Sequence, residues 1–166
     1  MICDTREILP LSFPSDPILT GIIEETLPVG DYQPAFEDGT RPPVVFERKS
    51  LADLAGTLTK GYDRFKAEML RAQEAGLMLM VIVEDPLTEV RKGAPYSQES
   101  GESLLQRCFT LMVKYRLPII FCQDRREAAR YILEFSKAVG RAYAERSKES
   151  HAQATTAEYG LATGEQ

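Results

Sequence analysis

Two acidic residues and a lysine stand where two predicted strands could bring them together. Glu47 and Lys49 directly follow apolar residues in the segment VVFERKS, and Asp31 follows a glycine in the segment VGDY. Alternate residues of a strand share a face, so Glu47 and Lys49 point to one side and Arg48 points to the other. If the two strands pair as a hairpin, Asp31 comes to lie beside Glu47.

Two carboxylates held this close repel each other, and one of them takes up a proton unless a cation lies between them. Carboxylate oxygens suit Mg²⁺ and Mn²⁺, and such an ion can activate a bound water as a nucleophile. Lys49 would then orient or deprotonate the water, or neutralise charge that develops on a phosphate. These residues therefore predict a divalent metal site with a lysine beside it.

Each of these acidic residues also has a purely structural interpretation. Asp31 beside a glycine could be a turn residue, and Asp53 could stabilise the first turn of a helix through the helix dipole. Asp4 and Arg6 share a strand face and could form an ion pair, which would leave Glu7 on the opposite side. The combination of two acids with a lysine favours the functional interpretation.

Short apolar runs alternate with segments of helical spacing, which predicts a mixed α/β domain. Strands are expected at 1–8, 18–37, 42–50, 77–86 and 118–124, and helices at 51–60, 62–76, 102–117 and 125–146. Ser50 is expected to cap the first helix, and Gly76 to end the second. The run LMLMVIV predicts a strand that is covered on both faces.

The composition is that of one ordinary globular domain. The 166 residues are 43% hydrophobic and 27% charged. No apolar run approaches the roughly 20 residues of a membrane span, so we expect no membrane segment. The net charge of −5 argues against a globally basic nucleic-acid binder and leaves room for a local basic face.

The ends of the chain and its cysteines point to a cytoplasmic protein, and we expect a bacterial or phage context. The first residues lack the basic start and apolar core of a secretory signal. Cys3, Cys108 and Cys122 fit neither a disulfide framework nor a zinc pattern, so we interpret them as reduced thiols. We expect one domain at 1–146 and a disordered tail at 147–166, where no apolar period is visible.

Three motifs occur in a fixed order along the chain. They are CDTRE at the start, then Gly30-Asp31-Tyr32, then Glu47-Arg48-Lys49 with Asp53 four residues beyond the lysine. Together they resemble the D-x-R-E strand and the G-D-x(n)-E-R-K-x(3)-D signature of the XPF family of structure-specific DNA endonucleases. That family is a branch of the PD-(D/E)XK, restriction-endonuclease-like superfamily.

This resemblance implies a central mixed sheet flanked by helices, and metal-dependent hydrolysis of DNA phosphodiesters with Mg²⁺ or Mn²⁺. It implies a substrate of branched, flap or other structured DNA, in DNA repair or recombination. Asp31, Glu47 and the backbone carbonyl of Arg48 are expected to bind the metal, Lys49 to be catalytic, and Glu7 to reach the metal through water. The expected supporting or DNA-binding residues are Asp4, Arg6, Arg48, Asp53 and Arg64.

The tandem helix-hairpin-helix module that usually follows this nuclease domain has no counterpart here, so branch selectivity could depend on a DNA-targeting partner protein. A homodimer is a second possibility, because MVKYRLPIIF and YILEFSKAV carry apolar surface, although core packing explains the same residues. The alternative function is a non-catalytic DNA-binding scaffold subunit of a nuclease complex. The intact set of two acids and a lysine favours catalysis, and an RNA substrate stays open.

Overall fold

The computed structural model describes residues 1–95 and 97–162 as one mixed sheet with helices on both faces. The strands are β1 (Ile2–Asp4), β2 (Ile23–Glu25), β3 (Tyr32–Gln33), β4 (Val44–Lys49), β5 (Met78–Val83) and β6 (Ile119–Phe121). The helices are α1 (Leu51–Leu58), α2 (Tyr62–Glu74), α3 (Leu87–Lys92), α4 (Gly101–Tyr115) and α5 (Arg125–Ala162).

The strands lie in the order β2-β1-β3-β4-β5-β6. β3 pairs antiparallel with both β1 and β4, whereas β4, β5 and β6 run parallel to one another. The antiparallel pairing of β3 with β4 places Tyr32 opposite Phe46 and confirms the pairing expected from the sequence. The mixed α/β class is confirmed as well.

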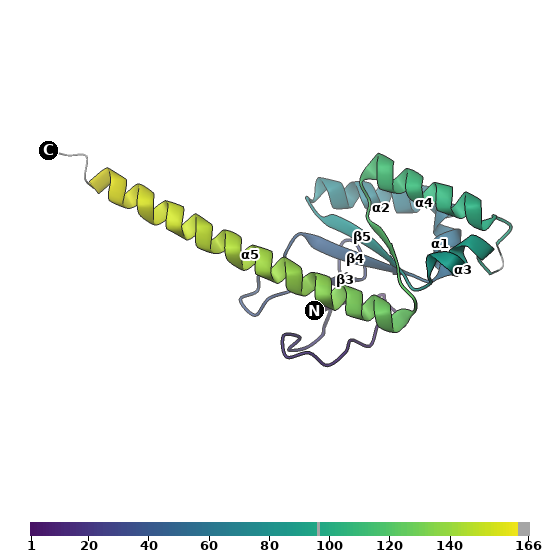
Figure 1. Ribbon diagram of the computed structural model, residues 1–166, viewed down its shortest axis with the longest axis horizontal. Coiled ribbons are helices and arrows are strands. Elements are labelled where there is room, and N and C mark those ends of the chain that lie inside the picture. The colour runs from purple at the N-terminus through teal and green to yellow at the C-terminus, as the bar shows by residue number, and fades with distance from the viewer. Residues whose placement is uncertain (96, 163–166) are drawn as a thin grey trace.

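Alternate residues of the central strands enter two separate cores. Val45 and Val81 pack with residues of α1, α2 and α4, whereas Phe46 and Ile82 pack with α5. Figure 1 shows α1 to α4 on one side of the sheet and α5 on the other, with its C-terminal part extending beyond the sheet. The covering of β5 on both faces explains why LMLMVIV is apolar throughout.

Local signals fix the ends of the helices. The Ser50 side chain accepts a hydrogen bond from the N–H of Asp53, which caps α1 as predicted. Gly76 follows α2 with a φ of +67°, in the left-handed region that a helix end favours. At the start of α5, Oδ1 of Asp124 accepts hydrogen bonds from the N–H groups of Arg126 and Glu127.

The strand predicted at 18–37 is wrong in its extent. The structure divides it into β2 and β3, which lie on either side of β1. Pro28 lacks the N–H that a sheet ladder needs, and Gly30 adopts a φ of +76°, so the chain turns between the two strands.

Two helical segments also differ from expectation. The short helix α3 lies in a region where neither a helix nor a strand was expected. It spans six residues, of which only Val90 is buried. The backbone of α5 stays helical to Ala162, past the tail boundary expected at 146, and residues 163–166 lie outside the described residues. The domain boundary at 146 stays a prediction.

All three cysteines are buried and unpaired, in agreement with their interpretation as reduced thiols. Burial raises the pKa of the Cys108 thiol to about 11 and that of the Cys122 thiol to about 11. Within residues 1–95 and 97–162, no helix is both long and apolar enough to cross a membrane.

We expect Gly30→Ala to lower the free energy of unfolding by about 2 kcal/mol or more, measured by urea denaturation. A left-handed backbone costs a residue with a Cβ roughly 1–2 kcal/mol, and here the Cβ would also lie 3.0 Å from the carbonyl oxygen of Phe46. Gly39→Ala is the matched control, since Gly39 has a φ of +82° but no atom within 4 Å of the added Cβ. Equal losses in the two variants would contradict the close approach at Gly30.

Candidate active site

Asp31 is held between strands β1 and β4 by its own backbone. Its N–H donates to the carbonyl oxygen of Phe46 at 2.7 Å, and its carbonyl oxygen accepts from the N–H of Asp4 at 2.8 Å. Its carboxylate oxygen Oδ2 accepts from the N–H of Arg48 at 2.7 Å. Asp31 therefore lies against the segment of β4 that carries Glu47, as the sequence predicted.

Glu47 and Lys49 share the face of β4 that looks toward α1 and α2. Nζ of Lys49 lies 2.7 Å from Oε1 of Glu47, and both side chains are largely buried. The Lys49 ammonium also lies 5.2 Å from the ring centroid of Phe65 on α2, a favourable cation–π distance. The structure thus brings together the three residues on which the predicted metal site depends.

Burial disfavours the charged forms of the two carboxylates at this site. It raises the pKa of Asp31 to about 7, and the negative charge of Glu47 adds to the effect. Burial also raises the pKa of Glu47, although the Lys49 ammonium acts in the opposite direction. Two buried carboxylates with a single lysine, paired to Glu47, favour the approach of a further cation.

The donor set fits a hard divalent ion. Asp31 and Glu47 offer carboxylate oxygens, and Arg48 offers a backbone carbonyl between Glu47 and Lys49. Among the described residues, no group of three or more His, Cys, Asp or Glu side chains is placed to hold a metal. The donors offered by these residues are oxygen atoms alone, which hard divalent cations prefer.

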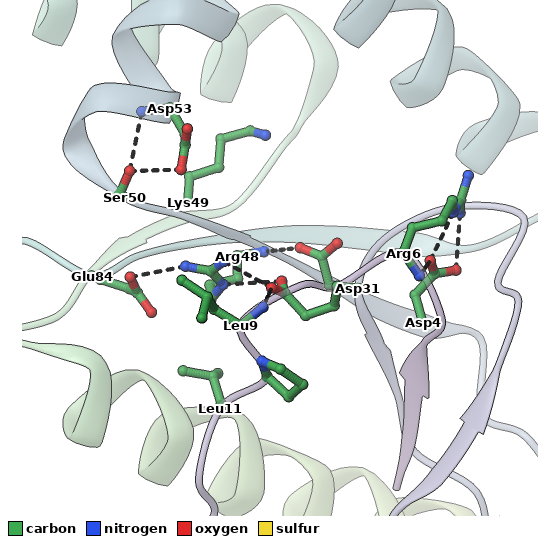
Figure 2. A network of polar contacts seen from close by, with 12 residues as sticks. Asp4, Arg6, Leu9, Leu11, Asp31, Arg48, Lys49, Ser50, Asp53 and Glu84 are labelled. Atoms are coloured by element: carbon green, nitrogen blue, oxygen red, sulfur yellow. Dashed lines mark hydrogen bonds and ion pairs between the residues drawn. The ribbon is translucent and has the colours of Figure 1, made fainter.

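The Arg48 side chain points to the opposite face of β4 and is bound there by two buried glutamates. Its guanidinium donates to both oxygens of Glu7, at 3.0 and 3.1 Å. It also donates to Glu84 at 3.0 Å (Figure 2). Burial opposes its charge, but these hydrogen bonds and charges raise the pKa of Arg48 above its ordinary value. The guanidinium thereby fixes the strand that carries Glu47 and Lys49.

Glu84 connects this network to helix α5. It follows β5, and its N–H donates to the carbonyl oxygen of Lys49 at 2.9 Å. Its Oε1 is 3.1 Å from the Arg125 guanidinium, in an ion pair without an aligned hydrogen bond. We name the four side chains of Glu7, Arg48, Glu84 and Arg125 the arginine–glutamate network.

Asp4 has the structural role that its spacing from Arg6 suggested. The two side chains form an ion pair at 2.7 Å, and Asp4 also accepts from the N–H groups of Arg6 and Leu27. Burial opposes ionisation of Asp4, but these bonds lower its pKa below the ordinary value. Asp4 thus joins the end of β1 to Leu27, and Figure 2 shows its carboxylate facing Arg6.

Three other predicted residues have different surroundings. Both oxygens of Glu7 are engaged by Arg48, so its contact with a metal through water stays a prediction. Asp53 is exposed in the first turn of α1, where its carboxylate accepts from the hydroxyl of Ser50 at 2.6 Å. Arg64 is exposed on α2, and its role near the site also stays a prediction.

Glu68 and Glu84 also lie near these residues and were not expected there from the sequence. Oε1 of Glu68 accepts from the N–H of Gly30 at 3.4 Å, next to Asp31, and its charge assists burial in raising the pKa of Glu47. Glu68 directly precedes Met69, which belongs to the buried face of α2. This position in the sequence could have indicated that Glu68 lies near the site. Glu84 follows a strand parallel to β4, and such strands end at the same edge of a sheet.

Residues 4–135 match the ERCC4 domain. The chain belongs to the ERCC4 domain family. The comparison with curated protein sequences found no match. The match to the ERCC4 domain confirms the XPF-type nuclease domain that the sequence motifs indicate.

The fold of this ERCC4 domain is similar to that of solved XPF structures. The structure of XPF from Aeropyrum pernix has a TM-score of 0.58 at 20% identity, over 92% of this chain and 68% of that one. A second structure, XPF from Aeropyrum pernix in complex with DNA, has a TM-score of 0.57 at 21% identity, over 87% of this chain and 64% of that one. These similarities confirm the restriction-endonuclease-like arrangement of a mixed sheet between helices.

We expect Arg48→Met to lower the free energy of unfolding of the ERCC4 domain by about 3–5 kcal/mol, because removing one partner of a buried ion pair leaves an uncompensated charge. Here it leaves Glu7 without its guanidinium partner and leaves Glu84 with Arg125 alone. Urea denaturation measures the loss.

Arg41→Met is the matched control for this prediction. Arg41 makes two hydrogen bonds with Glu25, at 2.7 and 2.8 Å, but both side chains are exposed. Exposed ion pairs contribute about 1 kcal/mol or less. Similar losses in the two variants would show that burial does not strengthen the dependence on Arg48.

Proposed function

We propose that this ERCC4 domain is a metal-dependent endonuclease that hydrolyses phosphodiester bonds of DNA. The observation that carries the proposal is the convergence of Asp31, Glu47 and Lys49 in a buried site where two carboxylates share one ammonium. Membership of the ERCC4 family supports it, as does the similarity to an XPF structure in complex with DNA.

Asp31 and Glu47, with the backbone carbonyl of Arg48, would hold Mg²⁺ or Mn²⁺. When bound, such an ion activates a water and polarises a phosphoryl oxygen. The protein's own contribution is to fix the carboxylates through β3 and β4, so that little reorganisation is needed during the reaction.

We assign to Lys49 the contact with the reacting phosphate and the attacking water. Glu47 and the Phe65 ring hold its ammonium in place. From this position the ammonium donates a hydrogen bond to the attacking water or to a phosphate oxygen that gains negative charge. Glu7 is assigned to positioning, because its carboxylate binds Arg48 and the N–H of Leu9.

The substrate proposed is branched, flap or other structured DNA, in DNA repair or recombination. A DNA-targeting partner protein or a second copy of the chain would extend the contact with such DNA, because one domain of this size covers little of a branch. The alternative, a non-catalytic scaffold subunit, has no chemical need for the acid–acid–lysine set. The cytoplasmic location also stays a prediction.

We expect wild-type protein to cut labelled flap, splayed or four-way DNA in Mg²⁺ or Mn²⁺ and to leave it intact in EDTA. Asp31→Asn and Lys49→Met should each lower the cleavage rate at least about 100-fold, the usual minimum for removing a group that acts in the transition state. Lys92→Met is the matched control, because Lys92 is exposed on α3 and pairs with Glu89. Single-stranded, duplex and RNA substrates in the same assay define the range.

A second measurement tests the metal site without relying on cleavage. Mn²⁺ should raise the melting temperature of wild-type protein, since a ligand that binds only the folded state stabilises it. The same addition should leave Asp31→Asn unchanged. DNA binding without cutting, together with no response to Mn²⁺, would favour the scaffold alternative.

A further inference from the structure

Two large apolar side chains stand exposed in the turn that follows β1. Ile8 is 90% exposed and Leu9 is 65% exposed, and both come directly after Glu7 of the arginine–glutamate network. Single exposed apolar residues are common on protein surfaces and need no explanation. A consecutive pair next to a candidate active site does need one.

The turn that carries them is held firmly by the protein. The N–H of Leu9 donates to Oε1 of Glu7 at 2.9 Å, and the N–H of Leu11 donates to the hydroxyl of Tyr32 at 2.7 Å. Arg125 donates to the carbonyl oxygens of Leu9 and Pro10, at 2.7 and 3.1 Å. The turn therefore presents its side chains in one fixed arrangement.

These bonds also determine what the turn can recognise. The N–H groups of Leu9 and Leu11 are already used, and Pro10 has none. The nearest preceding cation, Arg6, is paired with Asp4. The turn thus offers an apolar surface and little that could bind a phosphate.

The turn is also directly connected to the candidate active site. Glu7 contacts both the N–H of Leu9 and the guanidinium of Arg48, whose own N–H donates to Asp31. Figure 2 shows Leu9 beside the Arg48 guanidinium, with Asp31 close by. The turn follows Asp4, whose N–H donates to the carbonyl oxygen of Asp31, so DNA bound at Asp31 would pass this end of β1.

We propose that Ile8 and Leu9 form an apolar wedge that packs against the face of an unstacked DNA base near the bond that is cut. This inference rests on the proposed endonuclease function and specifies how the site selects its substrate. Base faces are apolar and are covered by neighbouring bases within a continuous duplex. They become accessible at a branch, a flap or a nick, and Ile and Leu are among the side chains that insert at disrupted base steps.

The wedge accounts for substrate choice without a basic surface. The chain carries a net charge of −5, so attraction to phosphates over the whole surface cannot provide the selection. A contact that forms only where stacking is broken adds affinity for DNA with exposed base faces and adds none for continuous duplex. The selection then lies in the turn, and the cleavage chemistry lies in Asp31, Glu47 and Lys49.

The test uses the full chain and a splayed-arm DNA with 2-aminopurine as the first unpaired base. The test variant is Ile8→Ser with Leu9→Ser. The matched control is Ile22→Ser with Ile23→Ser, a consecutive pair that is 48% and 58% exposed at the edge strand β2. Base fluorescence is read in EDTA, and the ratio of splayed-arm to duplex cleavage rates is read in Mg²⁺.

Wild-type protein and the control should change the 2-aminopurine fluorescence on binding, and the test variant should not. Because the wedge contacts only an unstacked base, the cleavage ratio should fall on the order of 10-fold in the test variant alone. A test variant that keeps both the fluorescence change and the ratio would overturn the wedge. So would a wild-type dimer, seen by sedimentation, that the test variant converts to monomer, because the turn would then be an interface between copies.

The two proposals fail in different ways. A fluorescence change that depends on Ile8 and Leu9, without cleavage of any DNA, would retain the wedge and overturn the endonuclease. Cleavage that depends on Lys49, without a fluorescence change in wild-type protein, would retain the endonuclease and overturn the wedge.

Discussion

Strand β4 carries Glu47, Arg48 and Lys49 into a sheet that helices cover on both faces, and each of these charges needs a partner because burial disfavours an unpaired charge. The alternation of the strand sends Arg48 to one face and Glu47 and Lys49 to the other. On the first face, Glu7 and Glu84 surround the guanidinium and Arg125 contacts Glu84, so two positive charges meet two negative ones. On the second face, Asp31 and Glu47 share one lysine.

The face of β4 that carries Arg48 therefore has a structural role, whereas the face that carries Glu47 and Lys49 is the candidate active site. The arginine–glutamate network is balanced within the protein and makes β4 rigid. The opposite face keeps an excess of negative charge, and there burial, with the charge of Glu47 adding to it, raises the pKa of Asp31. Proteins accept such local costs mainly at functional sites, where a bound ligand removes them.

The sequence predicted those features that depend on neighbours along the chain. Ser50 and Gly76 mark helix ends by their own chemistry, and the period of two in β4 correctly separates Arg48 from Glu47 and Lys49. The spacing of Asp4 and Arg6 in the sequence also offered an ion pair as one interpretation of Asp4, and the structure bears this out. The sequence could not predict Glu84 as a partner of Arg48, because that contact requires β5 to lie beside β4. The turn at Pro28 and Gly30 was missed because Ile22 to Val29 also suits an extended strand.

The contact between Arg125 and the carbonyl oxygens of Leu9 and Pro10 joins residues that are more than a hundred positions apart, with a separation of 116 from Leu9. Contacts of this separation form late, since the entropy of closing the intervening loop must be overcome first. During synthesis, the turn after β1 leaves the ribosome long before its anchor does. The turn after β1 thus gains this anchor only once α5 has docked, so a nascent or prematurely terminated chain that stops before Arg125 would carry Ile8 and Leu9 on a turn without it.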